Sequence, residues 1–352
     1  MSLQSFINEA ISPWMQEKGP DDDIVLSTRI RLARNFRAYP FPIKATSEQQ
    51  QAILDELEMH FSAGSKGAYQ ALDFINLTEL TRNEQQILVE KHLVSPYLIE
   101  QNQLSGILLS KNEQLSIMIN EEDHLRTQLY FPGFQLEYAL KEAFRVDDWL
   151  EEQIDYAFDE RRGYLTSCPT NVGTGLRASV MVHLPALTLT KKLAKMIPAI
   201  NQFGLVVRGI YGEGTEALGN IYQVSNQVTL GRTEEDIIEN LTSVVRKLIE
   251  HEREVRQVLV NESERRLEDR IFRSYGVLKH SRIIESKEAA ACLSDLRLGI
   301  DVGFLEDIPT SILNELMVLT QPAYLQHYYN SRLKSTERDI KRASLIRERL
   351  RF

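Results

Sequence analysis

The chain has 352 residues, of which 43% are hydrophobic and 8% aromatic, an ordinary globular composition with enough length for about two domains. Its net charge is −9, and residues 332–351 carry eight Lys or Arg against three acids, which leaves about −14 for the remainder. This acidic balance argues against general nucleic-acid binding. Cys168 and Cys292 match no zinc-binding spacing, and no apolar run reaches the ~18 residues of a membrane helix. We therefore expect a cytoplasmic protein without disulfides or a membrane segment.

The chain begins with a short amphipathic segment, followed by a strand rich in arginine. Residues 3–17 place apolar side chains at helical spacing, with a break at Pro13. Residues 24–34 alternate apolar and basic positions, so Arg29 and Arg31 project from the same face of the predicted strand. A half-solvated strand explains this pattern, but two adjacent guanidinium groups also suit a polyanion.

Two helices follow this strand. Residues 46–61 begin with a Thr46-x-x-Gln49 capping box and carry one apolar face, and a shorter helix covers residues 83–92. His92, at the end of the second helix, is either a satisfied surface histidine or a flat ring available to a base.

A period-two pattern over 107–109 and 115–119 predicts a β-hairpin. Its second strand leads into Asn120-Glu121-Glu122-Asp123-His124-Leu125-Arg126, where three consecutive acids precede a histidine and an arginine. A solvated charged turn explains such a run, but functional side chains also concentrate in loops at strand ends. Residues 134–158 then predict a long helix.

The segment 167–179 is rich in small polar residues and poor in bulky ones. Gly173 and Gly175 permit a tight backbone and the close approach of another molecule, with Cys168 at the entrance and Arg177 at the exit. The alternative is an ordinary surface turn beside an inert buried cysteine.

Strands and helices continue to residue 225, over 180–184, 188–202, 205–210 and 221–225. Gly212-x-Gly214-x-x-Ala217 fits the dinucleotide-binding fingerprint, but a strand-like run follows it instead of the long helix that this motif requires. We therefore interpret these glycines as a mobile loop that carries Glu213.

From residue 233 the pattern is almost entirely helical. A long helix covers 233–258, and we place the domain boundary near residue 255, where charges become dense. Further helices are predicted over 261–275, 286–296, 309–320, 321–331 and 336–350. The sequence thus predicts a mixed domain, 1–255, and a helical domain, 256–352.

The mixed domain combines clustered acids with five arginines at strand ends or in glycine-rich segments, and it has no Walker lysine loop or metalloprotease helix. Several converging guanidinium groups can hold a triphosphate and offset the charge of a transferring phosphoryl group. A carboxylate pair can orient a guanidinium nucleophile and accept its proton. The arginines are Arg29, Arg31, Arg126, Arg177 and Arg208.

Four segments, in the same order, resemble the signatures of phosphagen (guanidino) kinases. The resemblance implies that Ser27 and the five arginines bind ATP, whose phosphates carry Mg²⁺, and that His92 stacks on adenine. It implies that Glu122 is the catalytic base, with Glu121 beside it, and that Glu213, Glu122 and the reactive Cys168 surround the substrate guanidinium. The segments are Ser27-Thr28-Arg29-Ile30-Arg31, Asn120-Glu121-Glu122-Asp123-His124, Cys168-Pro169-Thr170-Asn171-Val172-Gly173-Thr174-Gly175-Leu176-Arg177 and Arg208-Gly209-Ile210-Tyr211-Gly212-Glu213.

The chain differs from the small-substrate phosphagen kinases in two ways, and these differences point to one branch of the family. Small-substrate members carry a helical domain ahead of the paired-arginine strand, and its absence here would leave the site open to an arginine on a protein surface. The helical region after residue 255 has no counterpart in those enzymes. Both features resemble the bacterial McsB-type protein arginine kinases, which implies an α+β fold: an antiparallel β-sheet flanked by helices, followed by an all-α C-terminal domain. It also implies ATP-dependent phosphorylation of protein arginines, with a small-guanidine phosphagen kinase or an inactive, repressor-binding pseudo-kinase as alternatives.

In that family the C-terminal module serves homodimerisation and recognises phosphoarginine. Arg338-Asp339-Ile340-Lys341-Arg342-Ala343 resembles its characteristic segment, so Arg338 is expected to bind the phosphate, Asp339 the guanidinium, and Arg342 to complete the pocket. The resemblance further implies a McsA-type activator, a Clp ATPase and protease that degrades marked proteins in the stress response, and the repressor it controls. It implies no membrane and no direct nucleic-acid partner. A solvated basic helix or a DNA-binding tail are alternative interpretations of this segment.

Overall fold

The computed structural model describes residues 3–61, 72–101, 103–209, 217–306, 308–309 and 312–350. The chain forms two compact units. The first comprises Met1–Pro20, Ser27–Val180 and Ser225–Thr242, and the second comprises Asp21–Leu26, Met181–Val224 and Ser243–Phe352. Each unit is therefore assembled from stretches that lie far apart in the sequence.

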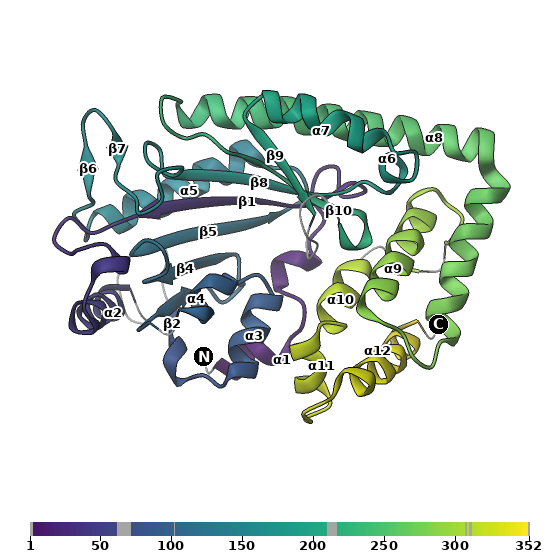
Figure 1. Cartoon of the computed structure of the whole chain (residues 1–352), viewed down its shortest axis with the longest axis horizontal. Helices are drawn as coiled ribbons and strands as arrows, with labels where there is room; N and C mark the ends of the chain where they lie inside the picture. Colours follow the sequence, from purple (N-terminus) through teal and green to yellow (C-terminus); the bar gives the residue numbers. More distant parts are fainter. Residues whose placement is uncertain are drawn as a thin grey trace. The chain divides into compact units, whose positions relative to one another are not determined.

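Eight strands form the main β-sheet: β1 (Val25–Arg34), β2 (Asp73–Asn76), β3 (Gly106–Leu109), β4 (Leu115–Ile119), β5 (Leu125–Pro132), β8 (Leu176–His183), β9 (Leu205–Gly209) and β10 (Ile221–Asn226). Their order is β2-β3-β4-β5-β1-β8-β10-β9 (Figure 1). The pairs β2–β3, β3–β4, β4–β5 and β1–β5 are antiparallel, as the resemblance implied. A separate hairpin joins β6 (Phe158–Asp159) to β7 (Gly163–Tyr164).

The register of β1 against β5 gathers basic residues on one face of the sheet. Arg29 pairs with Tyr130, Arg31 pairs with Gln128, and Arg126 lies two residues before Gln128 on β5. Opposed residues, and residues two apart on a strand, share a face. The intervening apolar residues of β1 are buried on the opposite face. The sheet thus has one arginine-bearing face at β1 and β5.

The helices of the first unit pack against this sheet. One buried cluster joins residues of α1, α3 and the turn before α4 to β3 and β4, and so covers the sheet beside the arginines. The elements are α1 (Leu3–Asn8), α2 (Ser47–Phe61), α3 (Arg82–Glu90), α4 (Pro96–Glu100), α5 (Leu136–Glu151) and the 3-10 turns η1 (Pro13–Gln16), η2 (Pro42–Lys44) and η3 (Leu77–Glu79).

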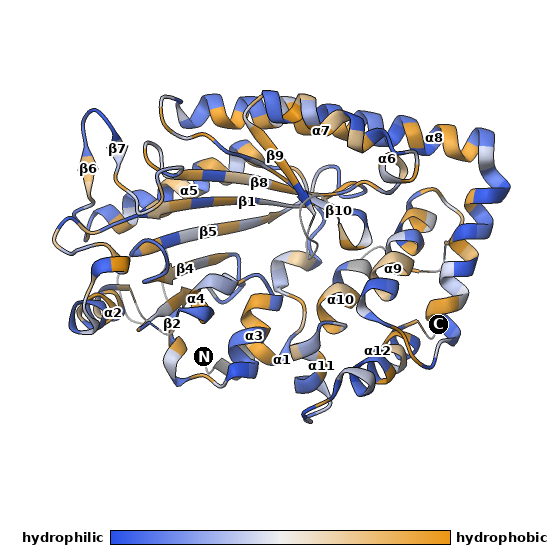
Figure 2. Ribbon diagram, viewed as in Figure 1, coloured by the Kyte–Doolittle hydropathy of each residue, from blue (hydrophilic) through white to orange (hydrophobic). Residues whose placement is uncertain are grey.

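The second unit is mostly helical. Its longest element, α8, runs from Glu234 in the first unit to His280 and has non-helical backbone angles at Ser263. Hydrophobic and hydrophilic residues alternate along it, as expected for a helix with one buried face (Figure 2). The other elements are α6 (Pro185–Leu189), α7 (Lys192–Gln202), η4 (Leu218–Asn220), α9 (Ser286–Asp301), α10 (Ile312–Leu319), α11 (Pro322–Tyr328) and α12 (Ser335–Arg349).

Buried charges hold three parts of the second unit together. The Glu252 carboxylate accepts hydrogen bonds from the backbone N–H groups of Ala186 and Leu187, at 3.0 and 2.9 Å, and so caps α6. Arg256 donates to Glu252 at 2.9 Å and to Asp301 of α9 at 3.2 Å. Because these charges are paired and hydrogen-bonded, their burial is tolerated, and removing any one of them would leave another uncompensated.

The predicted elements differ from the structure in a few places. The strands β2 and β5 were not predicted, the helix expected over 134–158 ends at Glu151, and the helix expected over 188–202 is divided at Lys191, which adopts φ +58°. The boundary predicted at residue 255 falls within α8.

Candidate active site

Four arginines of the first unit form one electrostatic cluster. Burial and the positive charges of Arg29, Arg126 and Arg177 lower the pKa of Arg31 well below its usual range. Arg31 Nε is buried and has no hydrogen-bond partner among the residues that the structure describes. Cations brought this close are favourable when an anion lies between them, so the cluster suits a polyanion such as a triphosphate.

Glu121 is the buried partner of this cluster. Its carboxylate accepts hydrogen bonds from Arg126 Nη1 and from the Ser95 hydroxyl. Burial alone would raise the pKa of Glu121, but the charge of Arg126 and these hydrogen bonds outweigh it, and the pKa lies below its usual value. Glu121 is therefore ionised and committed to holding Arg126, which makes it a poor proton acceptor. Ser95, which also caps α4, is a site residue that the sequence did not indicate.

Glu122 behaves in the opposite way. Burial and the neighbouring negative charges of Asp123 and Glu121 raise its pKa, while Arg126 and a hydrogen bond from Cys168 oppose that rise. A half-buried carboxylate with a raised pKa is suited to accept a proton. The structure thus brings Glu122 and Cys168 together.

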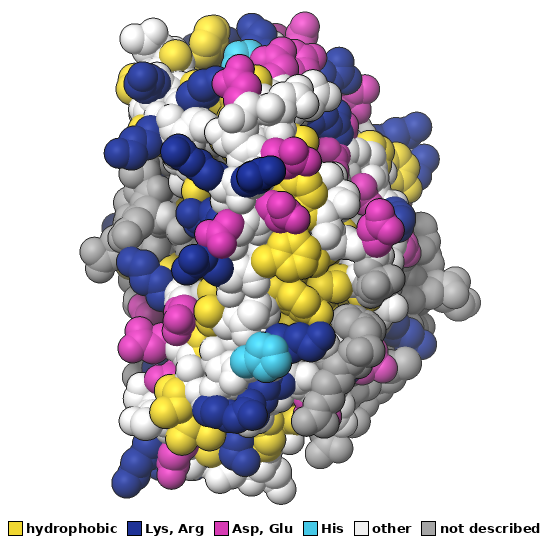
Figure 3. All heavy atoms as spheres, turned by 90° about the vertical axis from the view of Figure 1, so that its right-hand side faces the viewer, with side chains coloured by type: hydrophobic (Ala, Val, Ile, Leu, Met, Phe, Trp, Pro, Cys, Tyr) yellow, Lys and Arg dark blue, Asp and Glu magenta, His cyan; other side chains and the backbone are white. Residues whose placement is uncertain are grey.

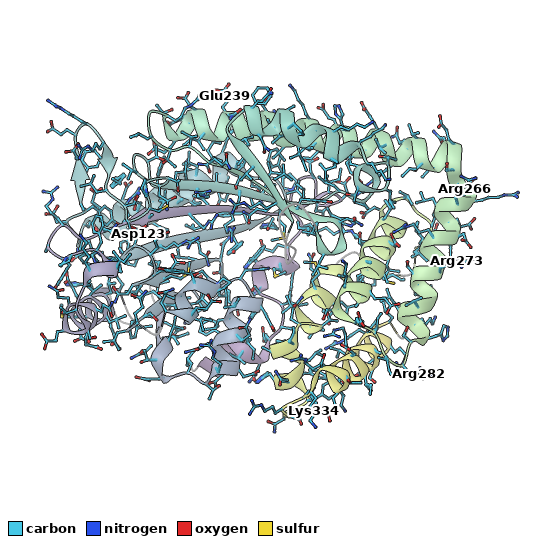
Figure 4. All side chains as sticks on the ribbon, viewed as in Figure 1. Asp123, Glu239, Arg266, Arg273, Arg282 and Lys334 are labelled. Atoms are coloured by element: carbon cyan, nitrogen blue, oxygen red, sulfur yellow. The ribbon has the colours of Figure 1, made fainter. Side chains whose placement is uncertain are left out.

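Asp123 connects the acidic turn to the glycine-rich loop. Its carboxylate accepts from the Ser167 backbone N–H at 2.6 Å and from Asn35 Nδ2 at 2.7 Å, and the residue is almost fully buried (labelled in Figure 4). Asn35 also donates to the Leu165 carbonyl at 3.0 Å. The third acid is therefore a positioning residue, and only its place beside Glu122 in the sequence could have indicated it.

His124 is structural. The Phe36 backbone N–H donates to its Nδ1 at 3.1 Å, so Nε2 carries the proton and donates to the Pro40 carbonyl at 2.9 Å. Burial lowers the pKa of His124 to about 4, so the ring stays neutral. The segment after β1 is thereby fixed against the acidic turn.

The glycine-rich loop is fixed by close backbone contacts. Gly175 has φ +65°, and a Cβ there would lie 2.5 Å from Arg34 Nη1 and 2.7 Å from the Ala33 carbonyl oxygen. Arg34 Nη1 donates to the Thr174 carbonyl at 3.0 Å. On the other side of the loop, Thr229 Oγ1 lies 2.9 and 2.7 Å from two of its carbonyl oxygens. Only glycine fits at 175, because the neighbouring backbone of the same chain lies this close.

The two ends of that loop carry the predicted side chains. Cys168 Sγ lies 3.0 Å from Thr170 Oγ1. Arg177 donates to the Asn226 carbonyl at 3.2 Å and lies 3.4 Å from Asn171 Oδ1. These two contacts help to orient the Arg177 side chain at the end of the loop.

His92 lies beside the arginine cluster. Burial and the charge of Arg29 lower the pKa of His92 to about 4, so the ring is neutral. Its backbone carbonyl accepts from Tyr130 and Gln128 of β5, at 3.1 and 3.0 Å. The turn after α3 is therefore attached to the arginine-bearing face. Ser27, the remaining predicted residue of this unit, is buried at the beginning of β1.

The last two predicted residues of the catalytic site lie elsewhere. Arg208 is an exposed residue of β9, in the second unit. Glu213 lies outside the described residues.

The three residues predicted to bind phosphoarginine lie on α12. Arg342 is buried and donates to the carbonyls of Thr320 and Ile284, both at 3.0 Å, and to Asp339 at 2.5 Å. These bonds favour a scaffold role for Arg342, whereas Arg338 is partly exposed. On the face shown in Figure 3, basic side chains are interspersed with acidic and hydrophobic ones.

The described part of the chain contains no group of three His, Cys, Asp or Glu side chains arranged to hold a metal ion. None of its helices combines the length and the apolar character needed to cross a membrane.

Family models match most of the chain. Residues 52–255 match the model described as ATP:guanido phosphotransferase, C-terminal catalytic domain, and residues 264–352 match the protein-arginine kinase McsB C-terminal domain. The two matches lie on either side of Ser263, where α8 departs from helical geometry.

Protein-arginine kinases of three bacteria are similar to this chain over nearly its whole length. A protein-arginine kinase of Bacillus velezensis is 59% identical over 99% of this chain and 96% of that protein. The protein-arginine kinase of Halalkalibacterium halodurans is 57% identical over 100% and 99%, and that of Bacillus subtilis is 58% identical over 99% and 96%.

Solved structures show the same fold. A lombricine kinase is 26% identical, with a TM-score of 0.59 over 72% of this chain and 70% of that one. The substrate-free duplicated taurocyamine kinase of Schistosoma mansoni is 27% identical, with a TM-score of 0.60 over 72% of this chain and 38% of that longer one.

Proposed function

Since this chain belongs to the protein-arginine kinases, within the ATP:guanido phosphotransferase family, we propose that it transfers the γ-phosphoryl group of ATP to arginine side chains of proteins. The observation that carries the proposal is the cluster of four mutually repelling arginines beside a glutamate of raised pKa. Converging guanidinium groups suit phosphates, and a carboxylate with a raised pKa suits proton transfer.

In this reaction a guanidinium nitrogen attacks the γ-phosphorus, the bond to the β–γ bridging oxygen breaks, and ADP leaves. Glu122 takes the proton from the attacking nitrogen, while Glu213 and Cys168 hold the rest of the guanidinium. The arginines neutralise charge on the transferring group. They are Arg29, Arg31, Arg126, Arg177 and Arg208, together with Ser27 on the same strand as the first two.

Two details of the nucleotide site extend this proposal. His92 stacks on adenine, which is supported by its neutral ring beside Arg29. Mg²⁺ is carried by the ATP phosphates, because Glu121 is engaged with Arg126 and Asp123 with Asn35 and Ser167. The ion, when bound with ATP, shields the phosphate charge from the incoming nucleophile.

The helical region after residue 255 recognises phosphoarginine and serves homodimerisation in this proposal. Arg338 binds the phosphate and Asp339 the guanidinium, while Arg342 supports Asp339 by the hydrogen bond at 2.5 Å. Phosphorylated proteins then pass to a Clp ATPase and protease in the cytoplasm, as part of a stress response that involves a McsA-type activator and a repressor.

A direct test replaces Glu122 by glutamine. We expect the Glu122→Gln variant to lose at least about 100-fold in transfer rate, because general acid–base catalysis contributes about that much, while its affinity for ATP changes less than about twofold. Phosphoarginine on an unfolded protein substrate, measured by mass spectrometry under conditions that preserve acid-labile phosphate, gives the rate. Glu137→Gln, on the exposed first turn of α5, is the matched control. Near wild-type transfer by Glu122→Gln would remove Glu122 from its proposed role.

Free arginine distinguishes the alternative, a phosphagen kinase for a small guanidino compound. We expect phosphorylation of protein and little turnover of free arginine. Efficient turnover of free arginine without labelled protein would favour the alternative, and no labelling of either would favour a binding module without catalysis.

A further inference from the structure

Tyr130 lies between the two parts of the candidate nucleotide site. Its hydroxyl accepts a hydrogen bond from Arg29 Nη1 at 3.0 Å and donates one to the His92 carbonyl at 3.1 Å. The Arg29 guanidinium carbon is also 5.5 Å from the centre of the Tyr130 ring. One side chain therefore joins an arginine of the phosphate cluster to the turn that carries His92.

The turn at His92 needs such support. His92 adopts φ +61°, a left-handed conformation that costs a residue other than glycine roughly 1 kcal/mol or more. Its carbonyl accepts a second hydrogen bond, from Gln128 Nε2 at 3.0 Å. Tyr130 and Gln128 are two residues apart on β5, so the sheet itself holds the turn in this conformation.

The N-terminal segment also contacts the Tyr130 ring. The Trp14 ring stacks on it with a centroid distance of 5.1 Å and an interplanar angle of 12°, and both residues are buried. Lys91, adjacent to His92, donates to the carbonyls of Phe6 and Glu9 at 2.6 and 2.8 Å. The same N-terminal segment thus contacts both Tyr130 and the turn.

We propose that Tyr130 is a positioning residue of the nucleotide site, which fixes the Arg29 guanidinium relative to His92, and that Trp14 holds Tyr130 in place. This inference rests on the proposed function, because it takes Arg29 and His92 as ligands of ATP. A guanidinium already held in its bound orientation loses less freedom when the ligand arrives, so its contact contributes more to affinity. The effect belongs to nucleotide binding and not to the chemical step.

The test is Tyr130→Phe, which removes both hydrogen bonds of the hydroxyl and keeps the ring on Trp14. We expect the Kd for a non-hydrolysable ATP analogue, measured by calorimetry, and the KM for ATP to rise about 5- to 10-fold, because a hydrogen bond to a charged group is lost. The kcat at saturating ATP stays within about twofold, a split that general loss of structure would not produce. Tyr138→Phe, at an exposed tyrosine of α5, is the matched control and leaves both constants unchanged.

An unchanged Kd in Tyr130→Phe, or a fall in kcat without a change in Kd, would overturn the proposal. Trp14→Phe keeps an aromatic ring but reduces the area stacked on Tyr130, so we expect a smaller rise in the Kd for the analogue. This variant provides a second measurement if Tyr130→Phe melts far below the wild type. A wild-type chain that binds the analogue but phosphorylates no arginine would contradict the proposed function alone, because the comparison of Kd values needs no turnover.

Discussion

A hydrogen bond from the Cys168 thiol acts on the pKa of Glu122. The thiol hydrogen bond lowers the pKa of Glu122, against burial and the two adjacent acids, which raise it. In its proposed role as the base, Glu122 acts only when deprotonated, so we expect activity to fall as the pH drops through this pKa. Removing the donor raises the pKa, and the acidic limb of the pH profile should therefore move to higher pH.

We expect this shift in Cys168→Ala and not in Cys168→Ser, whose hydroxyl can still donate. The measurement is kcat/KM for a protein substrate as a function of pH, with the nucleotide saturating. Superimposable profiles for Cys168→Ala and the wild type would show that the thiol does not influence the base.

The candidate site residues of the first unit could be proposed from the sequence because they lie in short, recognisable motifs. Paired arginines two apart on a strand, and acids after a strand, are visible in the sequence. The residues that hold them are not, because their contacts join distant segments: Ser95 with Glu121, and Asn35 with Asp123. In the sequence, Ser95 and Asn35 cannot be distinguished from other polar residues, because their partners are distant in the chain and are brought close only by the fold.

The glycine-rich loop packs so closely against β1 that there is no room for a side chain at Gly175. We expect Gly175→Ala to lower the free energy of unfolding by about 2 kcal/mol or more and to raise the KM for ATP, because the added Cβ would meet Arg34 Nη1 and the Ala33 carbonyl at 2.5 and 2.7 Å. Urea unfolding and steady-state kinetics measure the two effects.

Gly231→Ala is the matched control for that substitution. Gly231 also has a positive φ, of +74°, but no atom lies within 4 Å of a Cβ there. Its cost is therefore limited to backbone strain of about 1 kcal/mol, and ATP binding should not change. Equal effects of the two substitutions would show that the contact with β1 is unimportant.

On the helix α12, Arg342 is held by buried hydrogen bonds, whereas Arg338 is the proposed ligand of the phosphate. We expect Arg342→Met to lower the free energy of unfolding by about 2–4 kcal/mol, because two carbonyls and Asp339 lose a buried donor. Arg338→Ala should change stability by less than about 0.5 kcal/mol and abolish binding of phosphoarginine, measured by calorimetry. Retained binding in Arg338→Ala would place the phosphate elsewhere.

Most elements with a clear apolar period were predicted, whereas the strands β2 and β5 were not. The capping box at Thr46 is present, with hydrogen bonds of 2.9 and 3.3 Å to Gln49. The strand β5, in contrast, is buried along nearly its whole length, so it shows no alternation of apolar and polar residues. Lys191 divides α6 from α7 without a proline or glycine, which left no sequence signal for the break.

At the scale of the whole molecule, the second unit depends on the helix α9. Ser294 lies 2.8 Å from His183 Nε2 and accepts from Asn220 Nδ2 at 2.7 Å. Arg297 donates to the Asp22 carbonyl at 2.7 Å, just before β1 begins. We expect a chain that ends at residue 255 to aggregate or to melt at least about 10 °C below the full chain, because these buried polar groups lose their partners.

Thermal unfolding followed by circular dichroism measures this difference. Equal melting temperatures would mean that residues 1–255 form a self-sufficient domain, as the sequence suggested. The dense charges near residue 255 mark a change of composition within the helix α8. Where a folding unit ends depends on tertiary contacts, which cannot be inferred from composition.

The stack of Trp14 on Tyr130 also gives this enzyme a natural optical reporter. The chain has two tryptophans, and the other, Trp149, lies edge-on against Phe61 at 4.7 Å. With Trp149 replaced by phenylalanine, all tryptophan fluorescence would come from Trp14, which stacks on the same Tyr130 ring that Arg29 contacts. Nucleotide arrival and departure can then be followed in stopped-flow experiments without a dye, on the same protein whose turnover is being measured.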